Sequence, residues 1–223
     1  MTDLNGSLTH DAGVTRHRAM ASLTMAACAA ALSLAACHDD STTAPRTASS
    51  VTVLSGGSQS GTVGAALAAP VVLVVKDQNG TALSGVAVTV TPAGGAGSVS
   101  STALTTDANG QVSVNWTLGT VAGTDTLAAQ AGSLPALDVL ATATPDVPAS
   151  IVVVTGDAQS APAGTALPAP LTVKVVDQYG NPVPNATVTF ADDANGTLAS
   201  TTVTTDANGM AADTITLGPA AGT

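Results

Sequence analysis

Histidine and cysteine, the side chains that most often carry out catalysis or bind a transition metal, are confined to the first 38 residues of the chain. The three histidines are His10, His17 and His38, and the two cysteines are Cys28 and Cys37. Catalytic dyads and metal sites normally need His, Cys or clustered carboxylates. Because residues 39–223 contain neither His nor Cys, we expect the chain not to be an enzyme, with no catalytic, cofactor-binding or metal-binding residue.

Cys37 is the one residue whose surroundings predict a covalent modification. It follows Leu34, Ala35 and Ala36, at the end of an apolar, Ala-rich run that begins at Met20. Two arginines precede this run, as in export signals. The tetrapeptide resembles the lipobox of bacterial lipoproteins, in which the cysteine is acylated and becomes the new N-terminus. We therefore expect residues 1–36 to be a lipoprotein signal peptide, disordered or helical, and Cys37 to be the lipidation site.

Two other outcomes remain open for this leader, namely ordinary cleavage after a small residue or an uncleaved membrane anchor. Cys28 lies inside the apolar run and would be removed with the signal peptide. His38, rather than Asp, follows Cys37. By analogy with enteric lipoproteins, this favours the outer membrane or cell surface, and secreted or periplasmic forms are the alternative. Residues 37–49 are polar and contain Pro, and we interpret them as a flexible tether.

Aspartate is the remaining residue type with potential chemistry, since the chain has 15 acidic residues and all are Asp. An Asp at the first position of a turn can accept hydrogen bonds from the turn amides, and a Gly at the fourth can adopt positive φ. Calcium binding is the functional alternative, with Asp192 and Asp193 as its best contributors. Most of the acids are spread singly over separate turns, which favours the structural interpretation. Four Asp-x-x-Gly turns are present: Asp77–Gly80, Asp107–Gly110, Asp177–Gly180 and Asp206–Gly209.

These turns belong to an internal repeat. The segment Pro70–Gly80, PVVLVVKDQNG, returns at Pro170–Gly180 as PLTVKVVDQYG, a shift of 177 − 77 = 100. Later in the repeat the shift is 206 − 107 = 99. We therefore expect two modules, at residues 50–145 and 150–223, joined by a linker at 146–149.

The composition predicts that both modules are all-β. Val and Thr favour strands, the chain has 22 Gly and 12 Pro as turn residues, and aromatic residues make up 1%. The second copy ends where the first begins its closing strand, so we expect an incomplete second module. Either the polypeptide is longer or another chain completes the sheet. The strands expected in the first module are Val51–Ser55, Val71–Lys76, Gly85–Thr91, two short strands within Gly97–Thr106, Gln111–Leu118 and a closing strand over Thr124–Ala131 and Ala136–Thr142.

Comparison of the two copies predicts which side chains face the core. Lys174 stands where the first copy has Val74, so the even positions of this strand should face solvent. Val72 and Val74 are then candidates for exposed apolar residues. Asp213 aligns with Val114, whose position should face inward. A lone buried carboxylate is costly, so we expect a bulge or a position near water there.

The formal net charge of −10 excludes one class of partner. An acidic surface repels phosphate backbones, so we expect no nucleic acid partner. It also disfavours peripheral binding to anionic lipid. The expected contact with the membrane is through the N-terminal lipid alone.

The repeat resembles the group 1 bacterial immunoglobulin-like domains of the intimin/invasin family. The resemblance rests on Val75–Gly80 and Val175–Gly180, on Asn181–Phe190, and on the TTDANG turn in both copies. It implies tandem Greek-key β-sandwiches of about a hundred residues each, the second lacking its last strand. Classical members also have an outer-membrane barrel and a lectin-like tip, and the sequence contains neither, so host-cell adhesion is not carried over.

The function implied is that of a non-enzymatic, lipid-anchored surface protein that acts as a stalk or as a protein-interaction or adhesion module. Its partners would be surface proteins or polysaccharides. The alternative is the non-catalytic N-terminal part of a longer surface enzyme or polysaccharide-binding protein. Sugar-binding platforms usually need exposed aromatics, and Tyr179, at a turn, is the one candidate.

Overall fold

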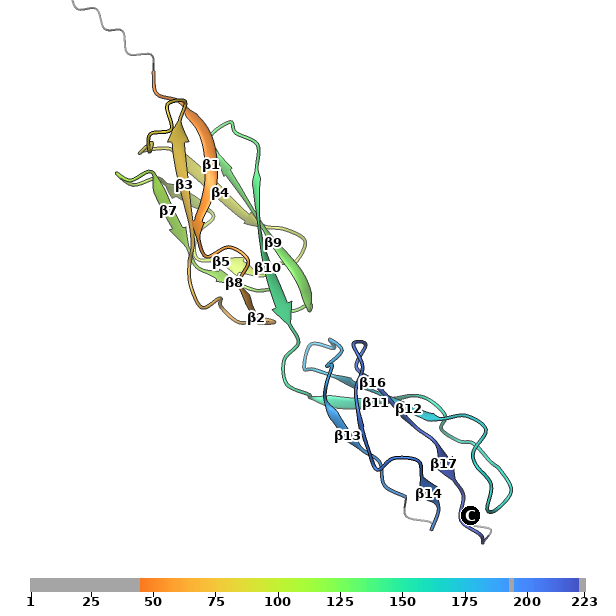
Figure 1. The fold of residues 1–223 in the computed structure, drawn as a ribbon. Helices are drawn as coiled ribbons and strands as arrows, with labels where there is room; N and C mark the ends of the chain where they lie inside the picture. Colours follow the sequence, from red (N-terminus) through yellow and green to blue (C-terminus); the bar gives the residue numbers. More distant parts are fainter. Residues whose placement is uncertain (1–44, 193–194, 221–223) are drawn as a thin grey trace, which may run out of the picture. The chain divides into compact units, whose positions relative to one another are not determined.

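The computed structural model describes residues 45–192 and 195–220 (Figure 1). The predicted signal peptide and Cys37 lie outside these ranges. The described residues form strands, turns and loops, with no helix. None of them therefore forms a helix that is long and apolar enough to cross a membrane. The prediction of an all-β fold is confirmed.

The first sandwich has two main sheets. One is antiparallel with strand order β1-β3-β7, and the other has the order β2-β10-β9-β4-β6. A short pair, β5–β8, lies beside them. The strands are β1 (Ala48–Ser55), β2 (Ser60–Thr62), β3 (Val71–Asp77), β4 (Ala87–Pro92), β5 (Ser98–Val99), β6 (Ala103–Thr105), β7 (Gln111–Val114), β8 (Trp116–Thr117), β9 (Gly123–Ala131) and β10 (Leu137–Thr144).

The core of the first sandwich follows from the alternation of side chains along its strands. Val71, Leu73 and Val75 of β3 are fully buried, as the odd positions were predicted to be. Trp116 fills the largest volume, and its indole N–H donates to the carbonyl of Ala96 at 2.7 Å. Burial of a tryptophan needs such a partner for its N–H group. The rest of this core is aliphatic.

Each of two segments predicted as single strands contains two strands in the structure. Gln111–Leu118 is divided at Asn115 into β7, which pairs with β3, and β8, which pairs with β5. The predicted closing strand is an antiparallel hairpin in which Leu127 of β9 lies opposite Val139 of β10. Gly132, with φ of 54°, reverses the chain direction between these two strands.

Val74 is buried rather than exposed, which corrects the expectation from Lys174. Its exposed fraction is 8%, whereas Val72 is half-buried. Val74 lies on the central strand of its sheet, between Thr52 of β1 and Gln111 of β7. Directly paired residues share one face of a sheet, so these two side chains flank the valine on both sides.

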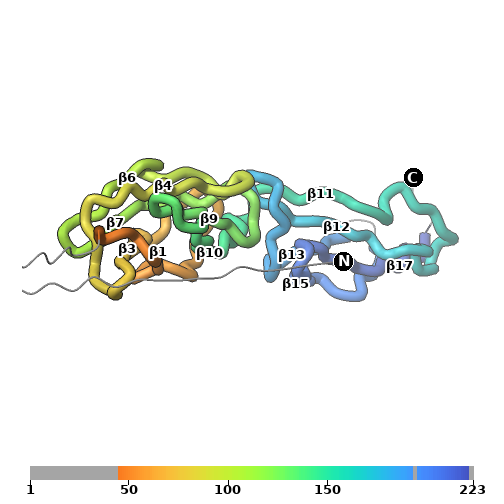
Figure 2. Tube along the Cα trace, turned by 90° about the horizontal axis from the view of Figure 1, so that it is seen from above, coloured from red at the N-terminus to blue at the C-terminus, as the bar shows by residue number. Residues whose placement is uncertain are grey.

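The second sandwich repeats part of this plan. Its first sheet has the order β11-β12-β16, matching β1-β3-β7, and β13 lies beside β15 as β4 lies beside β6 (Figure 2). The described residues contain no counterpart of β9 or β10, the strand pair that lies in the larger sheet of the first sandwich. The strands are β11 (Ser150–Thr155), β12 (Leu171–Val176), β13 (Thr187–Thr189), β14 (Thr197–Leu198), β15 (Thr202–Thr204), β16 (Met210–Asp213) and β17 (Ile215–Thr216).

The two sandwiches differ in how many apolar residues they bury. Among the described residues, the first sandwich buries seventeen apolar residues in one cluster and the second buries six. Ile215, the counterpart of the fully buried Trp116, is only half-buried. Hydrophobic stabilisation scales with the apolar area removed from water, so the described residues of the second sandwich gain less of it than those of the first.

The loop between β11 and β12 has the same glutamine hydrogen bonds as its counterpart between β1 and β3. In the first sandwich β2 pairs in parallel with β10, whereas residues 160–162 form no strand. The side-chain amide of Gln159 nevertheless donates to the carbonyls of Gly156 and Ala169, at 2.7 and 2.8 Å. Gln59 makes the same two bonds in the first copy. The loop is therefore held locally, by its glutamine.

Candidate functional site at the turn-bearing end of each sandwich

The four Asp-x-x-Gly turns have the geometry predicted for them. In each turn Oδ1 of the aspartate accepts two backbone N–H groups, two and four residues later, at 2.8–2.9 Å. The fourth residue, a glycine, has φ between 70° and 85°. Two backbone donors hold the pKa of Asp206 below its ordinary value. The turns are therefore structural, and two of them have additional partners.

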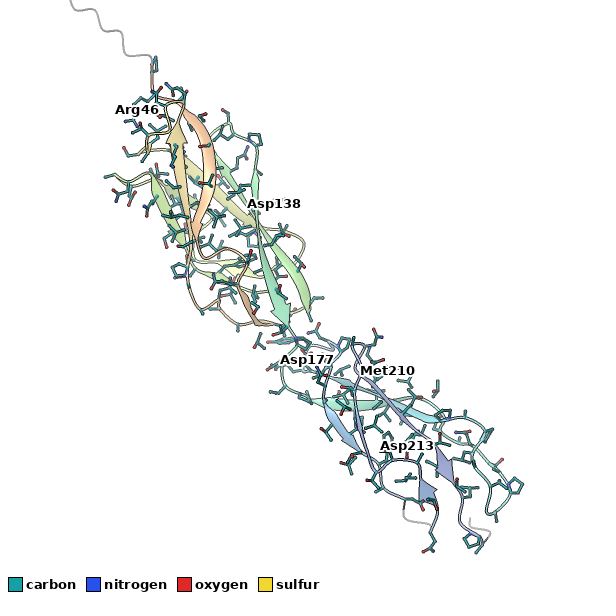
Figure 3. The ribbon with its side chains drawn as sticks, in the orientation of Figure 1. Arg46, Asp138, Asp177, Met210 and Asp213 are labelled. Carbon is teal, nitrogen blue, oxygen red and sulfur yellow. The ribbon has the colours of Figure 1, made fainter. Side chains whose placement is uncertain are left out.

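Asp77 uses its second oxygen to bind the segment that enters the first sandwich. Nε of Arg46 lies 2.6 Å from Oδ2 of Asp77, and Nη2 of Arg46 donates to the carbonyl of Ala82 at 2.7 Å. Figure 3 shows Arg46 at this end of the sandwich. The Arg46 guanidinium, aided by the turn amides, holds the pKa of the Asp77 carboxyl below its usual range despite burial.

Asp177 occupies the same position in the second sandwich, but its partners are neutral. Its Oδ2 accepts the backbone N–H of Asp146 at 3.0 Å and Nδ2 of Asn181 at 2.9 Å. Burial raises the pKa of this carboxyl, but the hydrogen bonds from Asn181, Asp146 and Tyr179 outweigh burial and leave the pKa lowered. Asp146 is the counterpart of Arg46, since 146 − 46 = 100.

Asn181 links this turn to the first sandwich. Its Oδ1 accepts the N–H of Ala122 at 2.8 Å, and its Nδ2 donates to the carbonyl of Thr120 at 2.9 Å. Both partners lie in the connection between β8 and β9. The side chain is 6% exposed, so these bonds are shielded from water. One asparagine thus hydrogen-bonds Asp177 of its own repeat and the backbone of the preceding repeat.

Sequence reasoning did not single out Asn181, although the alignment of the copies contains a signal. Position 81 is Thr where position 181 is Asn, and position 79 is Asn where position 179 is Tyr. The hydroxyl of Tyr179 lies close to Gly64 of the first repeat, where an added Cβ would be 2.8 Å from the hydroxyl oxygen. The positions that differ between two otherwise matching turns are those that contact the neighbouring repeat.

Of the two residues proposed for calcium, only Asp192 lies within the described residues. Within residues 45–192 and 195–220, no group of three or more His, Cys, Asp or Glu side chains is placed to hold a metal ion. The carboxylate of Asp192 accepts the backbone N–H of Gly196, which closes a local loop. Asp193 and Cys37 lie outside the described residues, so the lipidation of Cys37 stays a prediction.

Comparison with known proteins gives a family for the second repeat. Residues 151–221 match the family described as the bacterial Ig-like domain (group 1), which confirms the predicted resemblance. No curated protein matches the chain.

Several solved structures resemble the chain. The Escherichia coli adhesin FdeC is 27% identical over 78% of this chain and 56% of its own, with a TM-score of 0.44. The D0-D1 domain of intimin is 23% identical over 78% of this chain and 87% of its own, with a TM-score of 0.36. The Yersinia pseudotuberculosis adhesin InvE is 21% identical over 76% of this chain and 51% of its own, with a TM-score of 0.38. This chain therefore spans little more than half of the FdeC structure.

Proposed function

We propose that this chain, whose residues 151–221 are a group 1 bacterial Ig-like domain, is a non-enzymatic cell-surface protein that acts as a stalk or protein-interaction module. Lipid at Cys37 would anchor it, and residues 38–49 would lift the sandwiches from the membrane surface. The polar side chains of the turn-bearing ends are engaged in holding turns and joining segments. This arrangement suits a mechanical role better than a catalytic one.

The observation that carries the proposal is the pair of hydrogen bonds in which the side chain of Asn181 donates to the carbonyl of Thr120 and accepts the N–H of Ala122. A spacer transmits position only if its joints resist bending. The short linker between the repeats has Pro145 at one end and Pro148 at the other, which restricts the backbone. Side-chain bonds across the joint add to this restriction, and they are made by a residue that the first repeat lacks.

Stiffness at the joint is tested by replacing Asn181 with its first-repeat counterpart. We expect ¹⁵N relaxation to give one rotational correlation time for both sandwiches in the wild-type chain, and two different values in Asn181→Thr. Asn109→Thr, at an exposed turn position, is the matched control and should behave as wild type. Independent tumbling of the two sandwiches in the wild-type chain would contradict the proposal that the chain acts as a stiff stalk.

The anchor is tested separately in cells with a palmitate analogue. We expect labelling of the wild-type chain and of Cys28→Ala, and none of Cys37→Ala. Protease added to intact cells should digest the labelled chain if it is displayed outward. Unchanged labelling of Cys37→Ala would overturn the proposed lipid anchor. The proposal of a stalk is tested separately, by the relaxation measurement.

A further inference from the structure

The carboxylate of Asp177 lies next to the asparagine that links the two sandwiches, and it accepts four N–H groups. Oδ1 accepts the backbone N–H groups of Tyr179 and Asn181, at 2.8 and 2.9 Å. Oδ2 accepts Nδ2 of Asn181 at 2.9 Å and the backbone N–H of Asp146 at 3.0 Å. The two oxygens of a carboxylate offer about four lone-pair sites. All of them are occupied here, so a proton can bind only by displacing a donor.

The amide of Asn181 satisfies its partners in one orientation only. Nδ2 donates both to Oδ2 of Asp177 and to the carbonyl of Thr120, and Oδ1 accepts the N–H of Ala122. If the amide turned over, Oδ1 would face the carboxylate and the carbonyl, and Nδ2 would face the N–H group. Every contact would then join two acceptors or two donors. The carboxylate of Asp177 therefore fixes the orientation in which Asn181 can bind the first repeat.

The backbone that Asn181 binds is itself held by a second buried carboxylate. Oδ2 of Asp125, in β9, accepts the N–H of Gly119 at 2.7 Å, and this residue precedes Thr120 in the connection between β8 and β9. Asp125 is 7% exposed. The connection is therefore fixed from the side of the first sandwich, and Asn181 is oriented from the side of the second.

The first repeat has the same turn without this arrangement. Asp77 accepts the two turn amides on Oδ1, but its Oδ2 accepts Nε of Arg46. Thr81 stands at the position of Asn181 and has no amide group to orient. The path of hydrogen bonds from a turn carboxylate to a neighbouring repeat therefore belongs to the second repeat. Figure 3 shows Asp177 at the turn-bearing end of that sandwich.

We propose that Asp177 is the positioning residue of the joint between the sandwiches, and that its protonation releases the joint. This inference rests on the proposed stalk and adds a means of regulation to it. The charged carboxylate holds Nδ2 of Asn181 toward Thr120 and Oδ1 toward Ala122. A proton taken from water onto Oδ2 makes this oxygen a donor, which displaces Asn181 or the N–H of Asp146. The joint is therefore stiff at neutral pH and bends in acid.

The pH range of the release follows from the surroundings of the carboxylate. Burial raises the pKa of Asp177, and the hydrogen bonds from Asn181, Asp146 and Tyr179 outweigh burial and leave the pKa below its ordinary value of about 4. The contribution of Asp177 is present above this ordinary value and is lost as the pH falls through the folded pKa. Acid alone does not isolate Asp177, because other titratable or charged side chains lie on the elements around it: Asp125, Asp146, Lys174, Tyr179 and Asp206.

Asp177→Asn removes the charge at pH 7 while keeping the shape of the side chain. ¹⁵N relaxation of the full 223-residue chain should give one rotational correlation time for the wild type and two for this variant. Hydrogen exchange at the amide of Ala122 should become about tenfold faster, because this N–H loses its acceptor. Asp206→Asn is the matched control, since Asp206 accepts the amides of its own turn. It should behave as wild type.

A titration of the wild-type chain keeps the test decisive if Asp177→Asn fails to fold. As the pH is lowered from 7, the correlation times of the two sandwiches should separate together with the change in the carboxyl ¹³C shift of Asp177, while both sandwiches remain folded. In Asn181→Thr the two values should already differ at pH 7.

The possible failures are distinguishable from one another. A single correlation time and an unchanged Ala122 amide in folded Asp177→Asn would overturn the role of Asp177 and leave the stalk intact, as would a wild-type chain that stays stiff through the titration of Asp177. Equal loosening by Asp206→Asn would show that any weakened turn opens the joint, and would overturn the specific role as well. Two correlation times in the wild type at pH 7 would instead overturn the stalk.

Discussion

Arg46 and Asp77 form an ion pair, with 2.6 Å between Nε and Oδ2, that fastens the entering segment to the first sandwich. One hundred positions later the backbone N–H of Asp146 makes the corresponding bond to Asp177, at 3.0 Å. The same turn therefore accepts a charged donor in one repeat and neutral donors in the other. The side chain of Asn181 donates a further bond to Asp177 and also hydrogen-bonds the backbone of Thr120 and Ala122 in the preceding repeat.

The ion pair predicts a pH dependence for the first sandwich. The pKa of Asp77 is lowered by folding, so its contribution to stability is present above the unfolded value of about 4 and is lost as pH falls through the folded value. Asp77→Asn should be less stable than wild type at pH 7 and should lose less stability on acidification. Urea midpoints from Trp116 fluorescence at pH 7, 4 and 3 measure this difference.

Arg46→Gln is the matched variant for this prediction. Because the guanidinium is the largest cause of the lowered pKa, this variant should also weaken the acid dependence. Acid curves that run parallel in wild type, Arg46→Gln and Asp77→Asn would show that the pair does not contribute.

The unequal cores predict that the chain unfolds in two steps. Trp116 is the single tryptophan and lies in the larger core, so its fluorescence follows the first sandwich alone. Far-ultraviolet circular dichroism follows the strands of both sandwiches. We expect a first transition in the dichroism signal at low urea, with no change in fluorescence, and a second transition that both signals share. Coincident single transitions would instead show that the sandwiches unfold as one cooperative unit.

Alanine variants of two glycines distinguish the cost of a positive φ from the cost of a steric clash. Gly56 has φ of 78°, and a Cβ added there would lie 2.1 Å from the carbonyl oxygen of Pro70. Gly80 has φ of 76°, with no atom within 4 Å of an added Cβ. Gly80→Ala should cost about 1–2 kcal/mol of unfolding free energy from conformation alone. Gly56→Ala should cost about 3 kcal/mol or more, because the backbone must also shift. Equal costs, measured by urea unfolding, would contradict the role of the contact with Pro70.

Two aspartates of the second sandwich should respond in opposite ways to removal. Asp213→Val eliminates a buried oxygen without a partner and should raise the unfolding free energy by about 1 kcal/mol, after loss of the bond to Ser200. Asp206→Ala removes the acceptor of two backbone N–H groups and should lower stability. The first dichroism transition in urea measures both changes. Destabilisation by Asp213→Val would mean that the Ser200 bond outweighs the unpartnered oxygen.

The sequence was sufficient for the repeat, the turns and most of the core because each depends on local patterns. Val71, Leu73 and Val75 face inward as their alternation requires. The break between β7 and β8 was not predictable from alternation. Val114 and Trp116 are both buried, so the period of two continues while the chain passes from one sheet to another.

The contact of Asn181 with the first repeat and the burial of Asp213 could not be predicted either, and the reason is not the period of the strands. Exchange of Thr81 for Asn181 replaces one polar residue by another, so no hydrophobic signal marks the contact. Asp213 was expected to avoid burial on grounds of cost alone. The structure keeps the register of β16 and buries it, because the strand's hydrogen bonds to β12 hold its backbone in place.

Strand β11 has a consequence for the behaviour of the chain at high concentration. It is an edge strand in which Ile151, Val152, Val153 and Val154 follow one another, each 45–57% exposed. The strand itself carries no Lys and no Pro, the residues that natural edges use to block further pairing. Its counterpart β1 interrupts the apolar run with Thr52 and is flanked by serines. Aggregation of the chain should therefore start at β11, and a single lysine at Val153 should raise its solubility.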